Sequence, residues 1–272
     1  MTRRTAVVAA AVLAFAVLGG CQGGGSPARA GGSSSTTAAV AAGAPLSPDQ
    51  ANRLAGALFN DFDLGGADLL VTAPIAPTIT ATMRGAIDWK NIVGHVSLQL
   101  AGTGAGVTRG APPTTGSTLD LWWTSAAVIE QRPGLPEAMV ANGLPALHHV
   151  RRPPRPTTSP ADRLLGIITG LAAPQRDNPL LLIQERKGAF LRTDHAAGVA
   201  VEVFSYGATK RLWVGVDDGL LYRFELDVKD YAGPVVIDVR AHGPHDIPLP
   251  PSNDIVDVRE IPEIYAALIR RG

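Results

Sequence analysis

Apolar residues recur at two spacings along this chain, and each spacing predicts a different element. After residues 47–50 (SPDQ), apolar side chains follow at intervals of three and four, the period of one helix face. Ser47 and Gln50 have the spacing of a capping box, and Pro48 is well tolerated at a first helical position. The sequence therefore predicts a helix from residue 48 to Gly65. Its apolar face consists of Ala51, Leu54, Ala55, Leu58 and Phe62.

Two more helices follow from the same reasoning. Ser159 and Pro160 precede a second apolar stripe, which ends before Pro174. Residues 262–270 favour a short closing helix. The second stripe consists of Leu164, Leu165, Ile168 and Leu171.

Elsewhere the period changes to two, which is typical of half-buried antiparallel strands. The six prolines of segment 133–158 exclude regular structure there, apart from one turn at 137–141. Residues 102–116 are rich in glycine and proline and predict a loop, and Asp217-Asp218-Gly219 predicts a tight hairpin. The predicted strands are 79–84, 95–100, 119–124, 189–193, 199–204, 212–216, 221–228 and 235–240.

These elements predict an α+β fold built on a single curved antiparallel sheet. A sheet of this size must curl, close or be covered, so we expect a half-barrel with two or three helices on its concave face. The apolar residues on that face line either a filled core or a ligand cavity, and the sequence leaves both open. The candidate lining residues are Val96, Leu98, Leu100, Leu119, Leu121, Trp123, Tyr222, Phe224 and Leu226.

Residues 1–20 predict a secretory signal peptide. Arg3 and Arg4 precede an apolar run that is too short to span a bilayer, and small residues precede Cys21. This ending resembles the lipobox of bacterial lipoproteins. The resemblance implies cleavage before Cys21, thioether-linked acyl chains such as palmitate on its sulfur, and attachment to the extracytoplasmic face of the cell membrane. The alternative is an ordinary signal peptide followed by a chance cysteine.

Composition divides the rest of the chain. Residues 21–46 are mostly Gly, Ser, Thr and Ala and predict a flexible tether, whereas 47–272 predict one domain. Cys21 is the only cysteine, so no internal disulfide stabilises that domain. Loss of residues 1–20 removes two of 24 basic residues and no acid, leaving 22 against 24, a net charge near −2. This balance excludes the basic surface typical of nucleic-acid binding.

No motif in the sequence indicates a catalytic residue, a metal ligand or a cofactor site. Ser205 lacks the preceding glycine of a nucleophile elbow, and His242 and His245 lack the spacing of a zinc site. We therefore expect no enzymatic activity. The basic patch at 148–155 is either an exposed loop or a contact for an anionic lipid headgroup.

The order of these features resembles the actinobacterial lipoproteins of the LppX/LprA/LprF/LprG group, which share a fold with the carrier LolA and its receptor LolB. The resemblance rests on the lipobox, the tether, the capped first helix, and residues 84–89, 96–100 and 219–226. The proline-rich insert at 133–158 departs from the pattern. Membership implies a half-barrel with an apolar cavity that binds acyl chains.

We therefore expect a membrane-anchored lipoprotein of the cell envelope that binds a lipid or glycolipid for transport or presentation. Its partners would be that lipid, the membrane reached through Cys21, and an envelope transporter. The alternative is a non-enzymatic structural or interaction lipoprotein whose core is filled and which docks an envelope partner. An internal apolar cavity favours the first, and a filled interior favours the second.

Overall fold

The computed structural model of the protein describes residues 43–102 and 118–271. The predicted signal peptide at 1–20, the acylation site Cys21, the tether as far as residue 42 and nearly all of the predicted loop at 102–116 lie outside the described residues.

Helix α1 (Pro48–Leu64) begins at the predicted capping box, which is confirmed. The Ser47 hydroxyl oxygen accepts a hydrogen bond from the Gln50 N–H at 3.2 Å, and Gln50 Oε1 accepts one from the Ser47 N–H at 3.1 Å. Gly65 ends the helix with a φ of 105°, a conformation that residues with a side chain rarely adopt. The predicted boundaries of this helix therefore match its structure.

Five α-helices lie in the described ranges, and the sequence predicts three of them. Ser159 caps α3 by accepting a hydrogen bond from the Asp162 N–H at 3.2 Å. The remaining helices are α2 (Leu135–Ala141), α3 (Pro160–Thr169), α4 (Pro179–Gln184), α5 (Pro262–Arg271) and the 3-10 helix η1 (Ser252–Asp254). None of the helices in the described part of the chain is long and apolar enough to cross a membrane.

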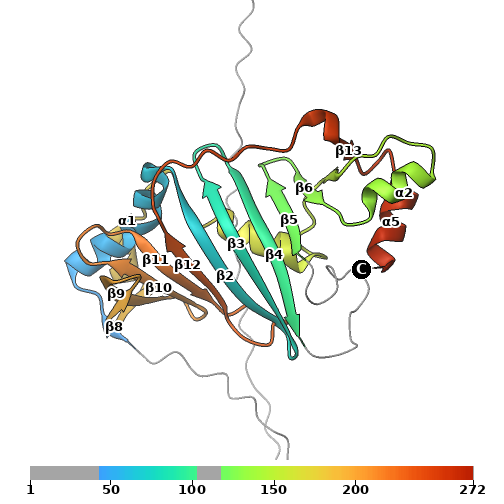
Figure 1. Cartoon of the computed structure of the whole chain (residues 1–272). Coiled ribbons are helices and arrows are strands. Elements are labelled where there is room, and N and C mark those ends of the chain that lie inside the picture. The colour runs from blue at the N-terminus through green and yellow to red at the C-terminus, as the bar shows by residue number, and fades with distance from the viewer. Residues whose placement is uncertain (1–42, 103–117, 272) are drawn as a thin grey trace, which may run out of the picture. The chain divides into compact units, whose positions relative to one another are not determined.

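One large, curved, unclosed sheet holds 13 strands, more than the sequence predicts (Figure 1). Its order is β1-β8-β9-β10-β11-β12-β2-β3-β4-β5-β6-β7-β13, and every pairing is antiparallel except that of β7 with β13. The strands are β1 (Ala44–Pro45), β2 (Gly66–Ala76), β3 (Ile79–Asp88), β4 (Val93–Gly102), β5 (Thr118–Trp123), β6 (Val128–Gln131), β7 (His149–Arg152), β8 (Gly188–Ala196), β9 (Val199–Tyr206), β10 (Lys210–Gly215), β11 (Leu221–Leu226), β12 (Val235–Arg240) and β13 (Ile255–Asp257).

Pairing between β12 and β2 joins two antiparallel meanders. Ile237 lies opposite Val71, and both are fully buried. The chain from β2 to β7 extends the sheet in one direction, and the chain from β8 to β12 extends it in the other (Figure 1).

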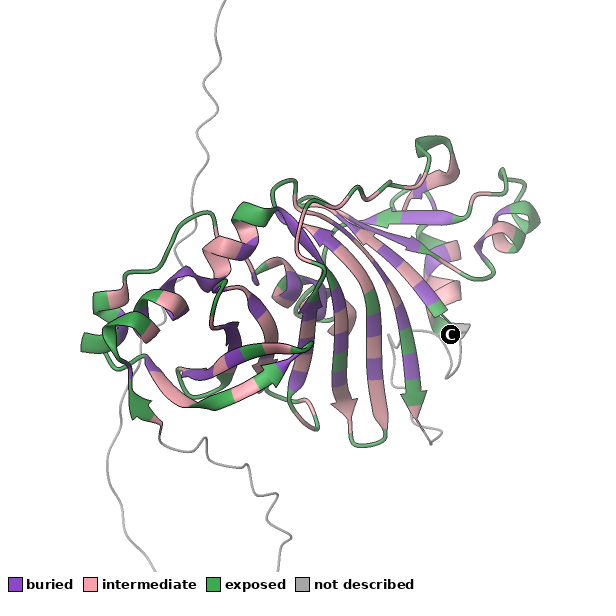
Figure 2. Ribbon diagram, turned by 60° about the vertical axis from the view of Figure 1, so that its left-hand side comes forward, coloured by how far each residue is buried: buried purple, intermediate pink, exposed green. Residues whose placement is uncertain are grey.

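Burial alternates along the strands, as the period of two predicts (Figure 2). Most buried residues of β2 to β5 and of β10 to β12, with Phe204 of β9, pack against the apolar stripes of α1 and α3 in one core. Two tryptophans fix α3 to this face of the sheet. Trp89 Nε1 donates to the Ile168 carbonyl at 3.2 Å, and Trp123 Nε1 donates to the Thr169 hydroxyl at 3.1 Å.

The prediction that segment 133–158 lacks regular structure beyond one turn is wrong. Strand β7 lies inside it, between β6 and β13, and α2 spans seven residues. No proline falls within β7, so its backbone donors remain available to both neighbouring strands. Pro136 sits in the first turn of α2, where a missing N–H costs nothing.

Candidate functional site

An apolar cleft of about 320 Å³ lies between helices α1 and α3 and strands β10 and β11. We call it the apolar cleft. Its floor is buried and its rim is exposed, so it opens to solvent beside α3. It is lined by Leu54, Leu58, Gly166, Ile167, Gly170, Leu171, Asp177, Tyr206, Lys210, Leu212, Phe224 and Leu226.

Two exposed glycines line the cleft at the end of α3. Gly166 lies in the last turn of the helix, and Gly170 is its C-cap residue. A Cβ atom added to Gly166 would meet no heavy atom within 4 Å. The cleft is therefore open to solvent on this side of α3.

Polar groups gather at the rim of the cleft. The Lys210 ammonium lies 5.6 Å from the centre of the Tyr206 ring, and burial raises the pKa of the Tyr206 hydroxyl. Asp177 is held beside α1, because its N–H donates to the Ala55 carbonyl at 3.0 Å. An amphiphile in the cleft would thus place its hydrocarbon among leucines and its polar end near a cation and two other polar groups.

Strand β11 contributes two of the predicted lining residues, Phe224 and Leu226, to the cleft. A β-bulge removes the third, because Trp213 pairs with Arg223 whereas Val214 pairs with Leu221. Tyr222 is the extra residue. It packs with Trp213 in a small cluster on the opposite face, and its hydroxyl donates to Asp218 at 2.7 Å.

The other predicted lining residues lie elsewhere on the helix-covered face. Val96, Leu98, Leu100 and Trp123 are at most 7% exposed and pack beneath α3 in the common core. They do not line the apolar cleft. Leu119 and Leu121 border a second cavity, of about 280 Å³.

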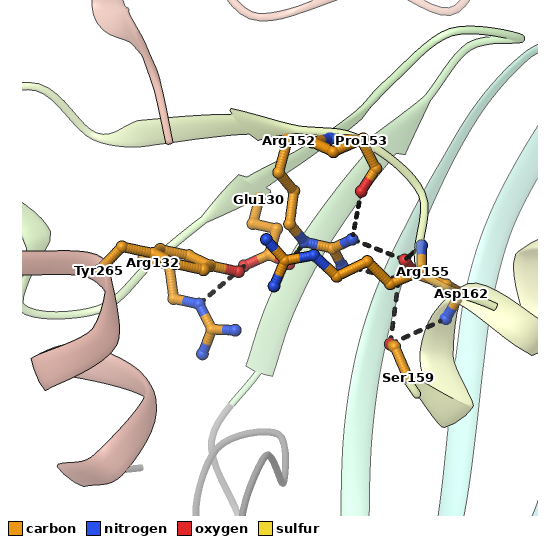
Figure 3. Close-up of polar contacts among 8 residues, drawn as sticks. All are labelled: Glu130, Arg132, Arg152, Pro153, Arg155, Ser159, Asp162 and Tyr265. Carbon is orange, nitrogen blue, oxygen red and sulfur yellow. Dashed lines mark hydrogen bonds and ion pairs between the residues drawn. The ribbon is translucent and has the colours of Figure 1, made fainter. Parts of the chain in front are cut away.

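That second cavity, the polar cavity, lies at the start of α3. Its apolar wall includes Leu119, Leu121 and Ile269, and its other wall consists of polar and charged groups. They are Glu130, Arg132, Arg152, Arg155, Thr158, Ser159 and Tyr265. Figure 3 shows all of these except Thr158, together with Asp162 of α3, which bonds to Arg152.

Arg152 is the centre of this network. Its two terminal nitrogens donate to the two carboxylate oxygens of Asp162 at 2.6 and 2.7 Å, and its Nε donates to Glu130. Glu130 also accepts from Arg132 Nε at 2.8 Å and from the Tyr265 hydroxyl at 3.2 Å. The charges buried here therefore face one another (Figure 3).

The pKa shifts agree with mutual neutralisation. Burial alone would raise the pKa of Asp162, but the hydrogen bonds and the charge of Arg152 outweigh it and hold that pKa below 3.8. Burial alone would lower the pKa of Arg152, and its bonds to Asp162 together with the charge of Glu130 raise it instead. These paired charges and hydrogen bonds hold α3 and α5 against the sheet.

A buried acid, which the sequence does not reveal, lies on α1. Asp61 is fully buried, and one of its oxygens accepts from the Leu221 N–H at 3.2 Å, while the other has no partner among the described residues. Burial raises the pKa of Asp61 well above 3.8. His242 Nε2 lies 3.6 Å from Asp61 Oδ1, and burial lowers the pKa of the His242 imidazole.

Two of the groups that the sequence singled out lie in the sheet or against it. Ser205 is buried within β9, and His242 Nε2 contacts the Leu221 carbonyl at 3.0 Å. Within 43–102 and 118–271, no group of three or more His, Cys, Asp or Glu side chains could hold a metal ion.

The comparisons with known proteins do not assign a family. No protein-family model matches the chain, and no curated protein does. A crystal structure of MucB matches with a TM-score of 0.35 and 12% identity, over 75% of this chain and 62% of MucB. The MucA/MucB complex of Pseudomonas aeruginosa matches with a TM-score of 0.33 and 11% identity, over 73% of this chain and 59% of that one.

MucB in complex with MucA(peri) matches with a TM-score of 0.31 and 11% identity, over 73% of this chain and 55% of that one. The chain thus spans less than two thirds of each of these MucB chains. TM-scores of this size do not establish a shared fold.

Proposed function

We propose that this protein is a membrane-anchored, LolA-like lipoprotein that binds an acyl chain of a lipid or glycolipid in the apolar cleft. It would present or carry that lipid at the extracytoplasmic face of the cell membrane, with Cys21 as the acylated anchor. The observation that carries this proposal is the apolar cleft beside α3, whose buried floor includes Leu54, Leu212 and Phe224.

The size and lining of the cleft favour one hydrocarbon chain. Ligand sites usually measure roughly 300 to 1,000 Å³ and are mostly apolar with a few polar groups. The cleft, at about 320 Å³, lies at the lower end of that range. Transfer of a hydrocarbon chain from water to this floor is favourable by about 25 cal/mol per Å² of apolar surface. Lys210 at the rim suits a carboxylate or phosphate headgroup.

The polar cavity is the weaker candidate. Arg132 and Arg152 already bind Glu130 and Asp162, so a ligand that binds either of these arginines would have to replace charge-assisted bonds.

The test is titration of the full chain with cis-parinaric acid, a fluorescent fatty acid. The chain carries Cys21→Ser, so that no acyl group can be attached at that position. Gly166→Trp fills the cleft without a clash at Cβ, and Gly166→Ala is the matched control that leaves most of the space.

We expect saturable binding to the parent and to Gly166→Ala, and at least about tenfold weaker binding to Gly166→Trp, which corresponds to about 1.4 kcal/mol. Urea midpoints verify that all three chains are folded. Absence of binding to the parent, or equal binding by Gly166→Trp, contradicts the proposal.

A further inference from the structure

Helix α4 exposes three large apolar side chains in six residues. Leu182 points into the core, whereas Leu180, Leu181 and Ile183 are 63%, 45% and 37% exposed. Among the described residues, the other large exposed apolar side chains are Leu64, Val140, Leu144 and Leu249, none of which lies on α4. A contiguous apolar patch on a soluble domain usually marks a contact with a membrane or another protein.

The chain enters the described domain close to this patch. Ala44 pairs with Phe190 and Pro45 with Ala189, near the start of β8, which follows α4 after only three residues. Cys21 precedes Gly43 by 22 residues in the sequence. An acyl anchor at Cys21 would therefore be connected to the domain at this edge.

The same segment adjoins the mouth of the apolar cleft. Asp177, two residues before α4, lines the cleft. After α4, the Lys187 carbonyl accepts a hydrogen bond from the Gly207 N–H at 2.8 Å, next to Tyr206 on the cleft rim. Both ends of the α4 segment are thus fixed beside the opening.

Charge around α4 suits an anionic lipid surface. Arg176, Arg186 and Lys187 are exposed and flank the helix, against the acids Asp177 and Glu185. Arg176 is held in place, because it donates to Asn60 Oδ1 at 3.1 Å and lies over the Phe59 ring. A local excess of one positive charge is small, so burial of the leucines would supply most of the binding.

From these observations we infer that α4 inserts into the headgroup region of a phospholipid bilayer and holds the cleft mouth at the membrane surface. The inference rests on the proposed function for the presence of a membrane, but not for the contents of the cleft. Insertion would let an acyl chain move between the bilayer and the cleft without crossing water. A second copy of the chain or a protein partner on the same patch would be a different occupant.

The test places a reporter on α4 in the full chain carrying Cys21→Ser, which removes both the anchor and the only native thiol. Leu181→Cys is labelled with an environment-sensitive nitrobenzoxadiazole dye. Val140→Cys is the matched control, because Val140 is an apolar residue that is 60% exposed on a different helix, α2. Vesicles contain equal parts of phosphatidylcholine and phosphatidylglycerol, with or without nitroxide-labelled lipid.

We expect the dye at Leu181→Cys to shift to shorter wavelength on addition of vesicles and to be quenched by the nitroxide lipid, while the dye at Val140→Cys does neither. Adding Leu180→Glu should weaken vesicle binding by about tenfold, since a charge replaces an inserted leucine. Leu180 is mostly exposed, so the urea midpoint should not change.

An unchanged dye signal at Leu181→Cys with vesicles overturns the inference. So does a wavelength shift that appears without vesicles as protein concentration rises, because it identifies a second copy as the occupant.

Binding of cis-parinaric acid without vesicles separates the two proposals. If the cleft stays empty while the dye inserts, only the acyl-chain function fails, and if the acid binds while the dye stays in water, only the α4 inference fails.

Discussion

The two ends of α3 border cavities of similar size and opposite character. At its end lies the apolar cleft, about 320 Å³, beside Gly166 and Gly170, and at its start lies the polar cavity, about 280 Å³, beside Ser159 and Asp162. Arg152 and the acids of the polar cavity bond to one another through charge-assisted hydrogen bonds, whereas the lining of the cleft is mostly apolar. The two cavities therefore differ in the chemistry of their lining groups and not in their volume.

The largest expected effect breaks the polar network. Arg152→Ala leaves Glu130 and Asp162 buried without their cation, so the free energy of unfolding should fall by about 3–5 kcal/mol. Urea unfolding followed by circular dichroism measures it. Arg151→Ala is the matched control: its side chain is 54% exposed and lies 3.6 Å from Asp257, and it should change stability by less than about 1 kcal/mol. Equal losses of unfolding free energy in the two variants would mean that the network does not stabilise the fold.

The pH dependence of the network comes next. Asp162→Asn should lower the free energy of unfolding by roughly 1.5–3 kcal/mol at neutral pH, through loss of hydrogen bonds to a charged partner. The folded pKa of Asp162 lies below its unfolded value of 3.8. The contribution of its charge is therefore complete above that value and is lost as pH falls through the lowered folded pKa.

Urea unfolding at a series of pH values should accordingly show the parent and Asp162→Asn converging in acid. A constant difference between them down to the lowest pH would exclude a contribution from the ionised carboxylate.

A smaller effect is expected from the rim of the network. Tyr265→Phe removes the hydroxyl that donates to Glu130 at 3.2 Å and keeps the ring over which Arg132 lies. Loss of one such bond should cost about 0.5–1.5 kcal/mol in thermal or urea unfolding. Binding of cis-parinaric acid should be unaffected, because Tyr265 lies in the polar cavity, and a loss of binding would mean that the two cavities are coupled.

The smallest effect is a gain of stability at the cleft. Gly166→Ala should raise the free energy of unfolding by about 0.5–1 kcal/mol, because Gly166 lies inside a helix and a Cβ there meets open space. Gly143→Ala is the control, since its Cβ also meets open space but its φ is 74°. That substitution should be destabilising. A loss of stability in Gly166→Ala would indicate that the space beside α3 is occupied.

Local signals in the sequence predict the scaffold well. The caps at Ser47 and Ser159 set the starts of α1 and α3, and the alternation in residues 95–100 identifies β4 and its buried face. These features depend on neighbours a few residues apart. The pairing of β7 with β13 joins residues more than 100 positions apart, such as Val150 and Val256, and no local pattern reveals it.

The candidate site depends on details that a regular pattern hides. A bulge at Tyr222 reverses the face of that side chain, so strict alternation assigns it to the wrong side of the sheet. Gly166 and Gly170 line the cleft. Their spacing of four in a predicted helix is visible in the sequence, but two glycines alone do not indicate a cleft. The apolar stripe of α3 indicates which side chains are buried, and it gives no indication of a cleft beside the helix.

The most direct test of the central claim is photolabelling of the full chain carrying Cys21→Ser with a fatty acid that bears a diazirine near its methyl end, followed by peptide mapping. We expect saturable labelling of peptides that contain Leu58, Ile167, Leu171 or Leu226, all on the walls of the apolar cleft. Labelling that is confined to Leu119 or Ile269 in the polar cavity, or that excess unlabelled fatty acid does not suppress, would contradict the claim that the cleft holds the acyl chain.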